Sequence, residues 1–111
     1  MKNIDSLKNT SQFKEVYENG KSFANKLLVL YVLKGGEGKK IGISVRKKIG
    51  NSVVRHRTVR LIRESFLQVK DLLPEGITLV VVARAMIAGK KQSEVTEALL
   101  HLCRLQKVIK Q

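Results

Sequence analysis

The chain has 111 residues, 43% of them hydrophobic, which fits one domain with a single core and excludes a disordered basic tail. Its formal charge of +13 indicates a polyanionic partner, and the candidates are RNA, DNA or an acidic membrane surface. The sequence contains no apolar run of the roughly 20 residues that span a bilayer, and its opening residues lead into no apolar secretory segment. A single cysteine, Cys103, suits a reducing compartment, so we expect a cytoplasmic protein with no membrane partner.

The first half of the chain predicts a helix followed by two strands. Asn9-Thr10-Ser11 is the expected cap of a short helix over residues 12–19, which Gly20 ends. Strand-forming residues run from 21 to 33, most densely from 27 to 33, and residues 39–45 alternate as a half-buried strand does. Because only a glycine-rich turn at 35–38 separates these strands, we expect them to pair as a hairpin.

The second half predicts a long helix, a strand and a last helix. Gly50-Asn51-Ser52 offers the cap of a helix over the amphipathic stretch of residues 53–69, and the only proline, Pro74, lies in the turn after it. Residues 77–84 form a mostly apolar run, as expected of a strand covered on both faces. Ser93 is the expected cap of a final helix that reaches residue 108. The order α-β-β-α-β-α predicts a two-layer α+β fold, one domain over residues 1–111 with a mixed sheet of about four strands.

Reactive side chains are too dispersed to predict an active site. His56 lies among arginines, His101 is expected at the surface or the edge of the core, and Cys103 is expected to be a buried small hydrophobe. The nine carboxylates include no pair at metal-binding spacing. The glycines near residue 36 lack the Lys-Ser/Thr ending of a phosphate loop. We therefore expect no catalytic side chain, and the sequence indicates no metal ligand.

The segment from Lys39 to Arg63 carries nine lysines and arginines and no acid. At about 100° per residue, its helical part gathers cations within an arc of roughly 120°, opposite an apolar arc. Acidic partners one turn away, which normally moderate such a face, are missing until Glu64. Arginine can bind two phosphate oxygens at once, so this segment predicts a nucleic-acid interface.

Four aromatic residues lie in the first third of the chain: Phe13, Tyr17, Phe23 and Tyr31. Aromatic rings beside a positive surface are the platform on which single-stranded bases stack. The alternative interpretation is that the same rings belong to an ordinary hydrophobic core. The sequence leaves both interpretations open.

The basic segment resembles the signature of the bacterial ribonuclease P protein subunit. The resemblance is carried by Lys47-Lys48-Ile49-Gly50-Asn51-Ser52-Val53-Val54-Arg55-His56-Arg57-Thr58-Val59-Arg60-Leu61-Ile62-Arg63-Glu64. Further similarity lies in Ser11-Gln12-Phe13-Lys14-Glu15-Val16-Tyr17, in Val29-Leu30-Tyr31 and in Val82-Ala83-Arg84. The chain departs from the family pattern at His56, where asparagine is usual, and at Val59, where lysine is usual. Any contact that the family's asparagine makes with RNA or metal does not transfer directly to His56.

The resemblance implies a protein that assists a catalytic RNA in removing the 5′ leader from precursor tRNA. The RNA subunit and its magnesium ions would carry out the chemistry, and the partners would be that RNA and the leader. The implied RNA-binding residues are Arg46, Lys47, Lys48, Arg55, His56, Arg57, Arg60 and Arg63. The implied leader cleft consists of Phe13, Tyr17, Val29 and Tyr31. The family also implies a left-handed connection between parallel strands, against the usual rule.

Two other functions fit parts of the sequence. A ribosomal protein that stabilises folded RNA would explain the charge equally well, but it would not require a leader cleft. An independent nuclease would require carboxylates at metal-binding spacing, which the sequence does not offer.

Overall fold

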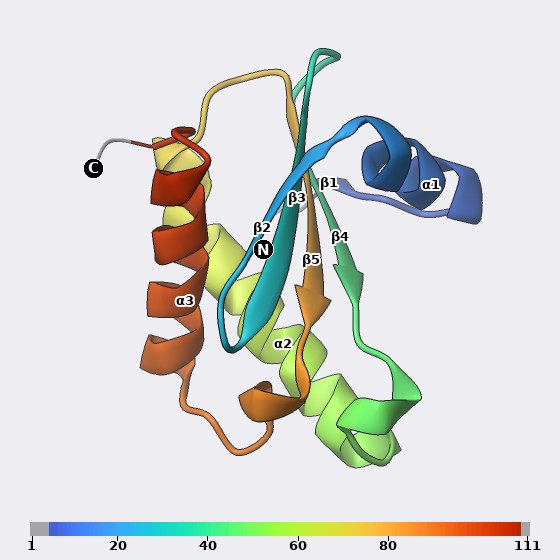
Figure 1. Ribbon diagram of the computed structural model, residues 1–111, viewed down its shortest axis with the longest axis vertical. Coiled ribbons are helices and arrows are strands. Elements are labelled where there is room, and N and C mark those ends of the chain that lie inside the picture. The colour runs from blue at the N-terminus through green and yellow to red at the C-terminus, as the bar shows by residue number, and fades with distance from the viewer. Residues whose placement is uncertain (1–4, 110–111) are drawn as a thin grey trace.

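The computed structural model describes residues 5–109. The two ends of the predicted domain, residues 1–4 and 110–111, lie outside the described residues. A mixed five-stranded sheet in the order β1-β4-β5-β3-β2 is covered on one face by α2 and α3 (Figure 1). The strands are β1 (Asp5–Ser6), β2 (Lys21–Ala24), β3 (Leu28–Lys34), β4 (Lys39–Ser44) and β5 (Ile77–Ala83). The helices are α1 (Thr10–Asn19), α2 (Ser52–Val69) and α3 (Gln92–Leu105), with single 3-10 turns at Lys47–Ile49, Lys70–Leu72 and Ala85–Ile87.

The predicted α+β class, the single sheet and the main helices are confirmed, with four strands of normal length and the short β1 at one edge. The predicted caps of the first two helices are also confirmed. Asn9 Oδ1 accepts the Gln12 N–H at 3.0 Å, and Asn51 Oδ1 accepts the Val54 N–H at 3.0 Å. The predicted cap of the last helix is wrong, because α3 begins one residue before Ser93. Glu94 reaches back there and accepts the Lys91 N–H at 3.0 Å.

The predicted hairpin between residues 21–33 and 39–45 is wrong. The first segment breaks at residues 25–27 into β2 and β3, and these two strands form the hairpin. β5 then inserts between β3 and β4, antiparallel to β3 and parallel to β4. A continuous apolar strand such as β5 is stabilised at the centre of a sheet, where both neighbours satisfy its backbone. This long-range pairing displaces the local one.

The connection from β4 through α2 to β5 is left-handed, as the family resemblance implied. In Figure 1 both arrows point downward, β4 lies to the right of β5, and α2 runs behind them. The usual right-handed crossover would bring the helix over the opposite face. Because α2 shares its face with α3, the other face of the sheet near the ends of β4 and β5 stays uncovered.

The core lies between the sheet and the helix pair α2 and α3. Alternate residues of β3 and β5 enter it: Leu28, Leu30, Val32, Leu79, Val81 and Ala83. Phe66 of α2 is fully buried there, and so are Leu99 and Leu102 of α3. A buried polar contact joins the two helices, with Ser65 Oγ 2.9 Å from Thr96 Oγ1. No helix among residues 5–109 combines the length and apolarity needed to cross a membrane.

Candidate nucleic-acid interface

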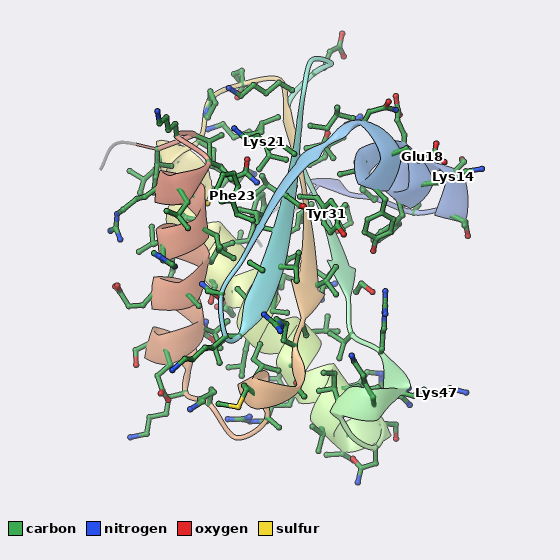
Figure 2. All side chains as sticks on the ribbon, viewed as in Figure 1. Lys14, Glu18, Lys21, Phe23, Tyr31 and Lys47 are labelled. Atoms are coloured by element: carbon green, nitrogen blue, oxygen red, sulfur yellow. The ribbon has the colours of Figure 1, made fainter. Side chains whose placement is uncertain are left out.

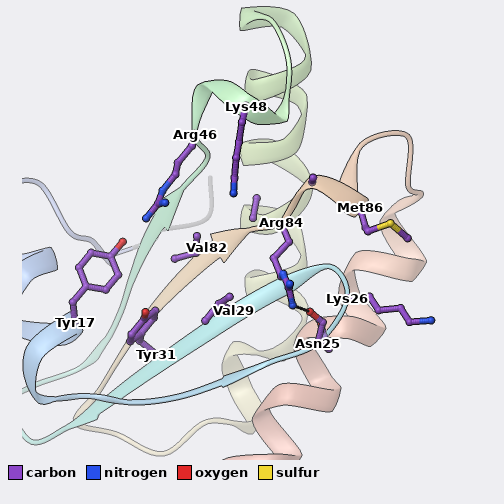
Figure 3. A pocket seen from close by; sticks show the side chains of 12 residues that line it. Tyr17, Asn25, Lys26, Val29, Tyr31, Arg46, Lys48, Val82, Arg84 and Met86 are labelled. Atoms are coloured by element: carbon purple, nitrogen blue, oxygen red, sulfur yellow. Dashed lines mark hydrogen bonds between the residues drawn. The ribbon is translucent and has the colours of Figure 1, made fainter.

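A cavity of about 860 Å³ lies on the face of the sheet opposite to α2 and α3 (Figure 3). We call it the cationic cavity. Its lining residues come from α1, the β2–β3 turn, β3, the β4–α2 connection and the end of β5. They are Tyr17, Asn25, Lys26, Val29, Tyr31, Arg46, Lys48, Val82, Ala83, Arg84, Ala85 and Met86.

The floor and one wall of the cavity are apolar and aromatic. Val29 and Val82 are cross-strand neighbours in the register of β3 and β5, and both are half-buried. Tyr31 lies two residues further along the same face of β3. Tyr17 of α1 meets it edge to face, with ring centroids 4.9 Å apart and an interplanar angle of 80°. Tyr17 remains 36% exposed, so part of its ring is available to a ligand.

Two other aromatic residues have structural positions outside the cavity lining. Phe13, predicted in the leader cleft, stands beside Tyr17 with ring centroids 6.3 Å apart, but it packs on Gly42 of β4. A Cβ at Gly42 would lie 2.7 Å from Phe13 Cε1, so the glycine is what lets α1 approach the sheet. Phe23 packs against the main core on the α3 side, whereas Tyr31 lies on the side of α1 (Figure 2).

Every charged side chain that lines the cavity is positive. Arg46 and Lys48 come from the β4–α2 connection, where burial of Ile49 anchors the 3-10 turn and residues 46–48 before it are exposed. Lys26 comes from the β2–β3 turn, and Arg84 comes from the end of β5. Lys47, the third predicted cation of this segment, points away from the cavity (Figure 2). With no acid in the lining, the cavity favours an anionic ligand.

The basic residues of α2 form a separate surface. Arg57, Arg60, Arg63 and His56 are exposed, as the helical periodicity predicted. Arg57 is fixed in place, because its Nη2 donates to the Lys90 carbonyl at 3.1 Å. Arg55 is half-buried, and its buried Nε has no hydrogen-bond partner among the described residues. Arg55, His56 and Val59 line one shallow cavity of about 220 Å³ with Val45 and Ser52.

The predicted site residues therefore divide into two groups. The cationic cavity brings together Tyr17, Val29, Tyr31, Arg46 and Lys48, and α2 carries the remaining cations on another surface. Sequence reasoning missed Lys26, Arg84 and Met86 as lining residues. A cation directly after the apolar run of residues 77–83 was the available signal for Arg84. No sequence pattern indicated that residues 25 and 26 would form a turn beside it.

Other reactive groups lie away from the cavity. His101 is exposed on α3, as expected, with its Nδ1 3.2 Å from Asn25 Nδ2. Cys103 is fully buried in the core, as expected, and this burial raises the pKa of its thiol to about 12. Among residues 5–109, no three side chains of histidine, cysteine, aspartate or glutamate gather as metal ligands would.

Comparison with known proteins gives a consistent result. The family model described as ribonuclease P matches residues 1–106. The ribonuclease P protein component of Lachnoclostridium phytofermentans is 55% identical over 106 residues, which cover 95% of this chain and 91% of that protein. The component of Brevibacillus brevis is 44% identical over 107 residues, covering 95% of this chain and 85% of that protein.

Solved structures agree in fold. The Staphylococcus aureus RNase P protein superposes with a TM-score of 0.86 at 29% identity, covering 97% of this chain and all of that chain. The Thermotoga maritima RNase P protein gives a TM-score of 0.80 at 29% identity, covering 90% of this chain and 96% of that chain.

Proposed function

This chain belongs to the ribonuclease P protein family, and we propose that it is the protein subunit of ribonuclease P. In this role it binds the catalytic RNA and the 5′ leader of precursor tRNA, and it acts in the cytoplasm. It assists the endonucleolytic removal of the leader that leaves the mature tRNA 5′ end. The RNA subunit, with bound magnesium, carries out the hydrolysis.

The cationic cavity is the observation that carries the proposal. A single strand of RNA has two chemical parts, bases with flat apolar faces and a chain of phosphates. Tyr17 and Tyr31 offer rings to the bases, at about 1–3 kcal/mol per stacked base. Lys26, Arg46, Lys48 and Arg84 offer charge to the phosphates. This combination supports a single-stranded leader as the ligand of the cavity.

The exposed arginines of α2 support a second contact, with the catalytic RNA. Arg57, Arg60 and Arg63 lie on a surface separate from the cavity, so both RNAs have room to bind at once. Two polyanions repel each other, and a protein of charge +13 between them reduces that repulsion. The expected result is tighter binding of the substrate and of magnesium without a protein side chain in the reaction.

Magnesium is assigned to the RNA because of the chemistry of the protein's side chains. Magnesium in proteins is held by carboxylates and by phosphates of bound substrates. The lining of the cationic cavity contains no carboxylate, and its lysines and arginines would repel a cation. Phosphate oxygens of the RNA partners are therefore the expected ligands.

Reconstitution tests the proposal. The chain is expected to restore cleavage of precursor tRNA by a bacterial ribonuclease P RNA at low magnesium. Tyr31→Ala should weaken binding of precursor tRNA to the reconstituted enzyme by about 1–3 kcal/mol and leave mature tRNA binding unchanged. Tyr31→Phe, which keeps the ring, serves as the matched control.

Three outcomes would contradict it. If Tyr31→Ala lowered the affinity for precursor tRNA and for mature tRNA equally, the result would favour a general RNA-stabilising protein. Cleavage by the purified chain without any RNA subunit would indicate an independent nuclease. A flat salt response would also count against it, since about five phosphate contacts should weaken binding roughly a hundredfold over a fourfold rise in salt.

A further inference from the structure

Arg84 is held at one end of the cationic cavity by the β2–β3 turn. Its backbone N–H donates to the Leu27 carbonyl at 2.9 Å. Its side chain extends from the end of β5 to Asn25, where Nη1 donates to the backbone carbonyl at 2.8 Å (Figure 3). An exposed arginine would otherwise sample many rotamers, so this pair of contacts fixes the position of the guanidinium.

Asn25 itself is held by five hydrogen-bonding contacts. Its N–H donates to the Leu28 carbonyl at 2.9 Å, and its Oδ1 accepts the N–H groups of Leu27 and Leu28 at 3.1 and 3.0 Å. Its Nδ2 donates to the Ala98 carbonyl of α3 at 2.9 Å and lies 3.2 Å from His101 Nδ1. The side chain of Asn25 thus ties the turn to α3 and fixes the carbonyl that Arg84 contacts.

The guanidinium keeps most of its donors for a ligand. Arginine has five N–H donors in a planar fork, and the contact with Asn25 uses one of them. No carboxylate lines the cavity to occupy the others. A phosphodiester group presents two non-bridging oxygens that match such a fork. Tyr17 and Tyr31 lie at the opposite end of the cavity, across Val29 and Val82 (Figure 3).

We propose that Arg84 binds a backbone phosphate of the strand in the cationic cavity, and that Asn25 is the positioning residue that holds Arg84 in place. The strand crosses the floor of the cavity with a base against the tyrosines and a phosphate further along at Arg84. This inference rests on the proposed function, since it assigns the strand to the tRNA leader.

The test compares Arg84→Gln with Lys34→Gln in the enzyme reconstituted with its RNA subunit. Lys34 ends β3, is exposed and lies outside the cavity lining, so its variant removes the same charge elsewhere. Arg84→Gln should weaken precursor tRNA binding about tenfold to a hundredfold and leave mature tRNA binding unchanged. It should also lower the slope of log affinity against log salt by about 0.7, the value for one lost phosphate contact on a single strand.

Two further variants are informative. One separates the geometry of the Arg84 guanidinium from its charge, and the other tests the positioning role of Asn25. Arg84→Lys keeps the charge and should recover only part of the affinity. Asn25→Ala should weaken precursor binding by less than Arg84→Gln does, and the double variant should be no worse than Arg84→Gln alone. A purely structural role of Asn25 would instead give additive losses. Thermal unfolding of each variant checks that it folds, and Arg84, an exposed residue, supplies a test that does not depend on Asn25→Ala folding.

The inference and the proposed function fail in different ways. If Tyr31→Ala weakens precursor binding but Arg84→Gln behaves like Lys34→Gln, the role of Arg84 is refuted and the leader cavity stands. If neither Tyr31→Ala nor Arg84→Gln discriminates precursor from mature tRNA, the leader cavity itself is refuted. Arg84→Gln should not weaken the binding of a precursor whose leader has a single nucleotide, because such a leader is too short to reach Arg84. If it still weakened binding, Arg84 would not contact a phosphate further along the leader.

Discussion

The two faces of the sheet carry residues of similar type, but one face packs in the core and the other lines the cationic cavity. On β3, Leu28 and Leu30 enter the core beneath α2 and α3, while the alternate residues Val29 and Tyr31 face the cationic cavity. On β5, Val81 is fully buried in the core, and its neighbour Val82 is a half-buried part of the cavity floor. Successive side chains of a strand point to opposite faces, so one apolar run supplies both surfaces.

The difference between the faces comes from what covers them. Two helices seal the first face, whereas α1 covers only part of the second, where it packs on β3, β4 and β5. Apolar area that stays open beside four cations is suited to a ligand that is both aromatic and anionic. The hydrophobicity of a strand residue therefore does not tell whether it stabilises the fold or contacts a ligand.

Among single substitutions that compare the two faces, Val81→Glu should have the largest effect on stability. It places an unpaired carboxylate in the sealed core, at a free-energy cost comparable to the whole stability of about 5–15 kcal/mol. We expect an unfolded chain by circular dichroism. A folded variant with native thermal stability would show that the first face is not sealed.

Phe66→Ala should have the next largest effect on stability, because it removes a fully buried ring from the sealed face. We expect a loss of about 3–5 kcal/mol in the free energy of unfolding, measured by urea titration. Tyr17→Ala removes a ring from the other face, where it is 36% exposed, and should cost about 1 kcal/mol. Equal losses from the two variants would erase the distinction between the faces.

Val82→Glu should keep the fold and weaken leader binding. The carboxylate would lie on the cavity floor, where it repels phosphate, and like charges brought together cost several kcal/mol. Precursor tRNA affinity of the reconstituted enzyme should fall at least about tenfold, with mature tRNA affinity unchanged. Val82→Thr, which has the same shape and no charge, should bind as the original chain does.

Gly42→Ala should move α1 and disturb the second face alone. The new Cβ would meet Phe13 Cε1 at 2.7 Å and Leu7 Cδ1 at 2.9 Å, which is closer than van der Waals contact allows. We expect a stability loss of about 1–3 kcal/mol in urea titration and weaker precursor binding, because Tyr17 moves with α1. Adding Phe13→Leu should restore both quantities by making room, and failure of this rescue would argue against the contact.

Cys103, on the sealed face, should make a smaller and pH-dependent contribution to the free energy of unfolding. Burial raises the pKa of its thiol from 9.0 to about 12, so the folded state holds its proton more tightly than the unfolded state. The stability from this group is fully present below pH 9 and is lost progressively as pH rises towards 12. Urea titrations at increasing pH should show a decline that is shallower in Cys103→Ala.

Much of the fold follows from local patterns in the sequence. The caps at Asn9 and Asn51 and the exposed basic face of α2 depend on interactions within a few residues, so periodicity and cap chemistry predict them. The predicted hairpin failed because β5, far away in the sequence, takes the central place between β3 and β4, where both neighbours satisfy its backbone. Ser93 failed as a cap because Glu94 was better placed to reach back to the helix start.

The site was predictable only in part. Tyr17, Val29 and Tyr31, three of the four residues predicted for the leader cleft, line one cavity. Arg46 and Lys48, which were predicted separately as RNA-binding residues, line the same cavity. Phe13, the fourth residue predicted for the cleft, stands beside Tyr17 but packs on Gly42 and does not line the cavity. Lys26 and Arg84 were missed because they approach each other only when β2 and β3 form their hairpin beside β5.

The sequence by itself determined the family, the boundaries of α1 and α2 within a residue or two, and the positive charge of the surfaces that we assign to RNA. These properties depend on residue type and short-range spacing, which the chain carries in any conformation. The last helix was predicted to reach residue 108, whereas α3 ends at Leu105. Only the tertiary structure decided which face of β3 and β5 stays open, and that Arg84 is held by Asn25. Both depend on the left-handed crossover and on β5 between β3 and β4, which are contacts between residues far apart in the chain.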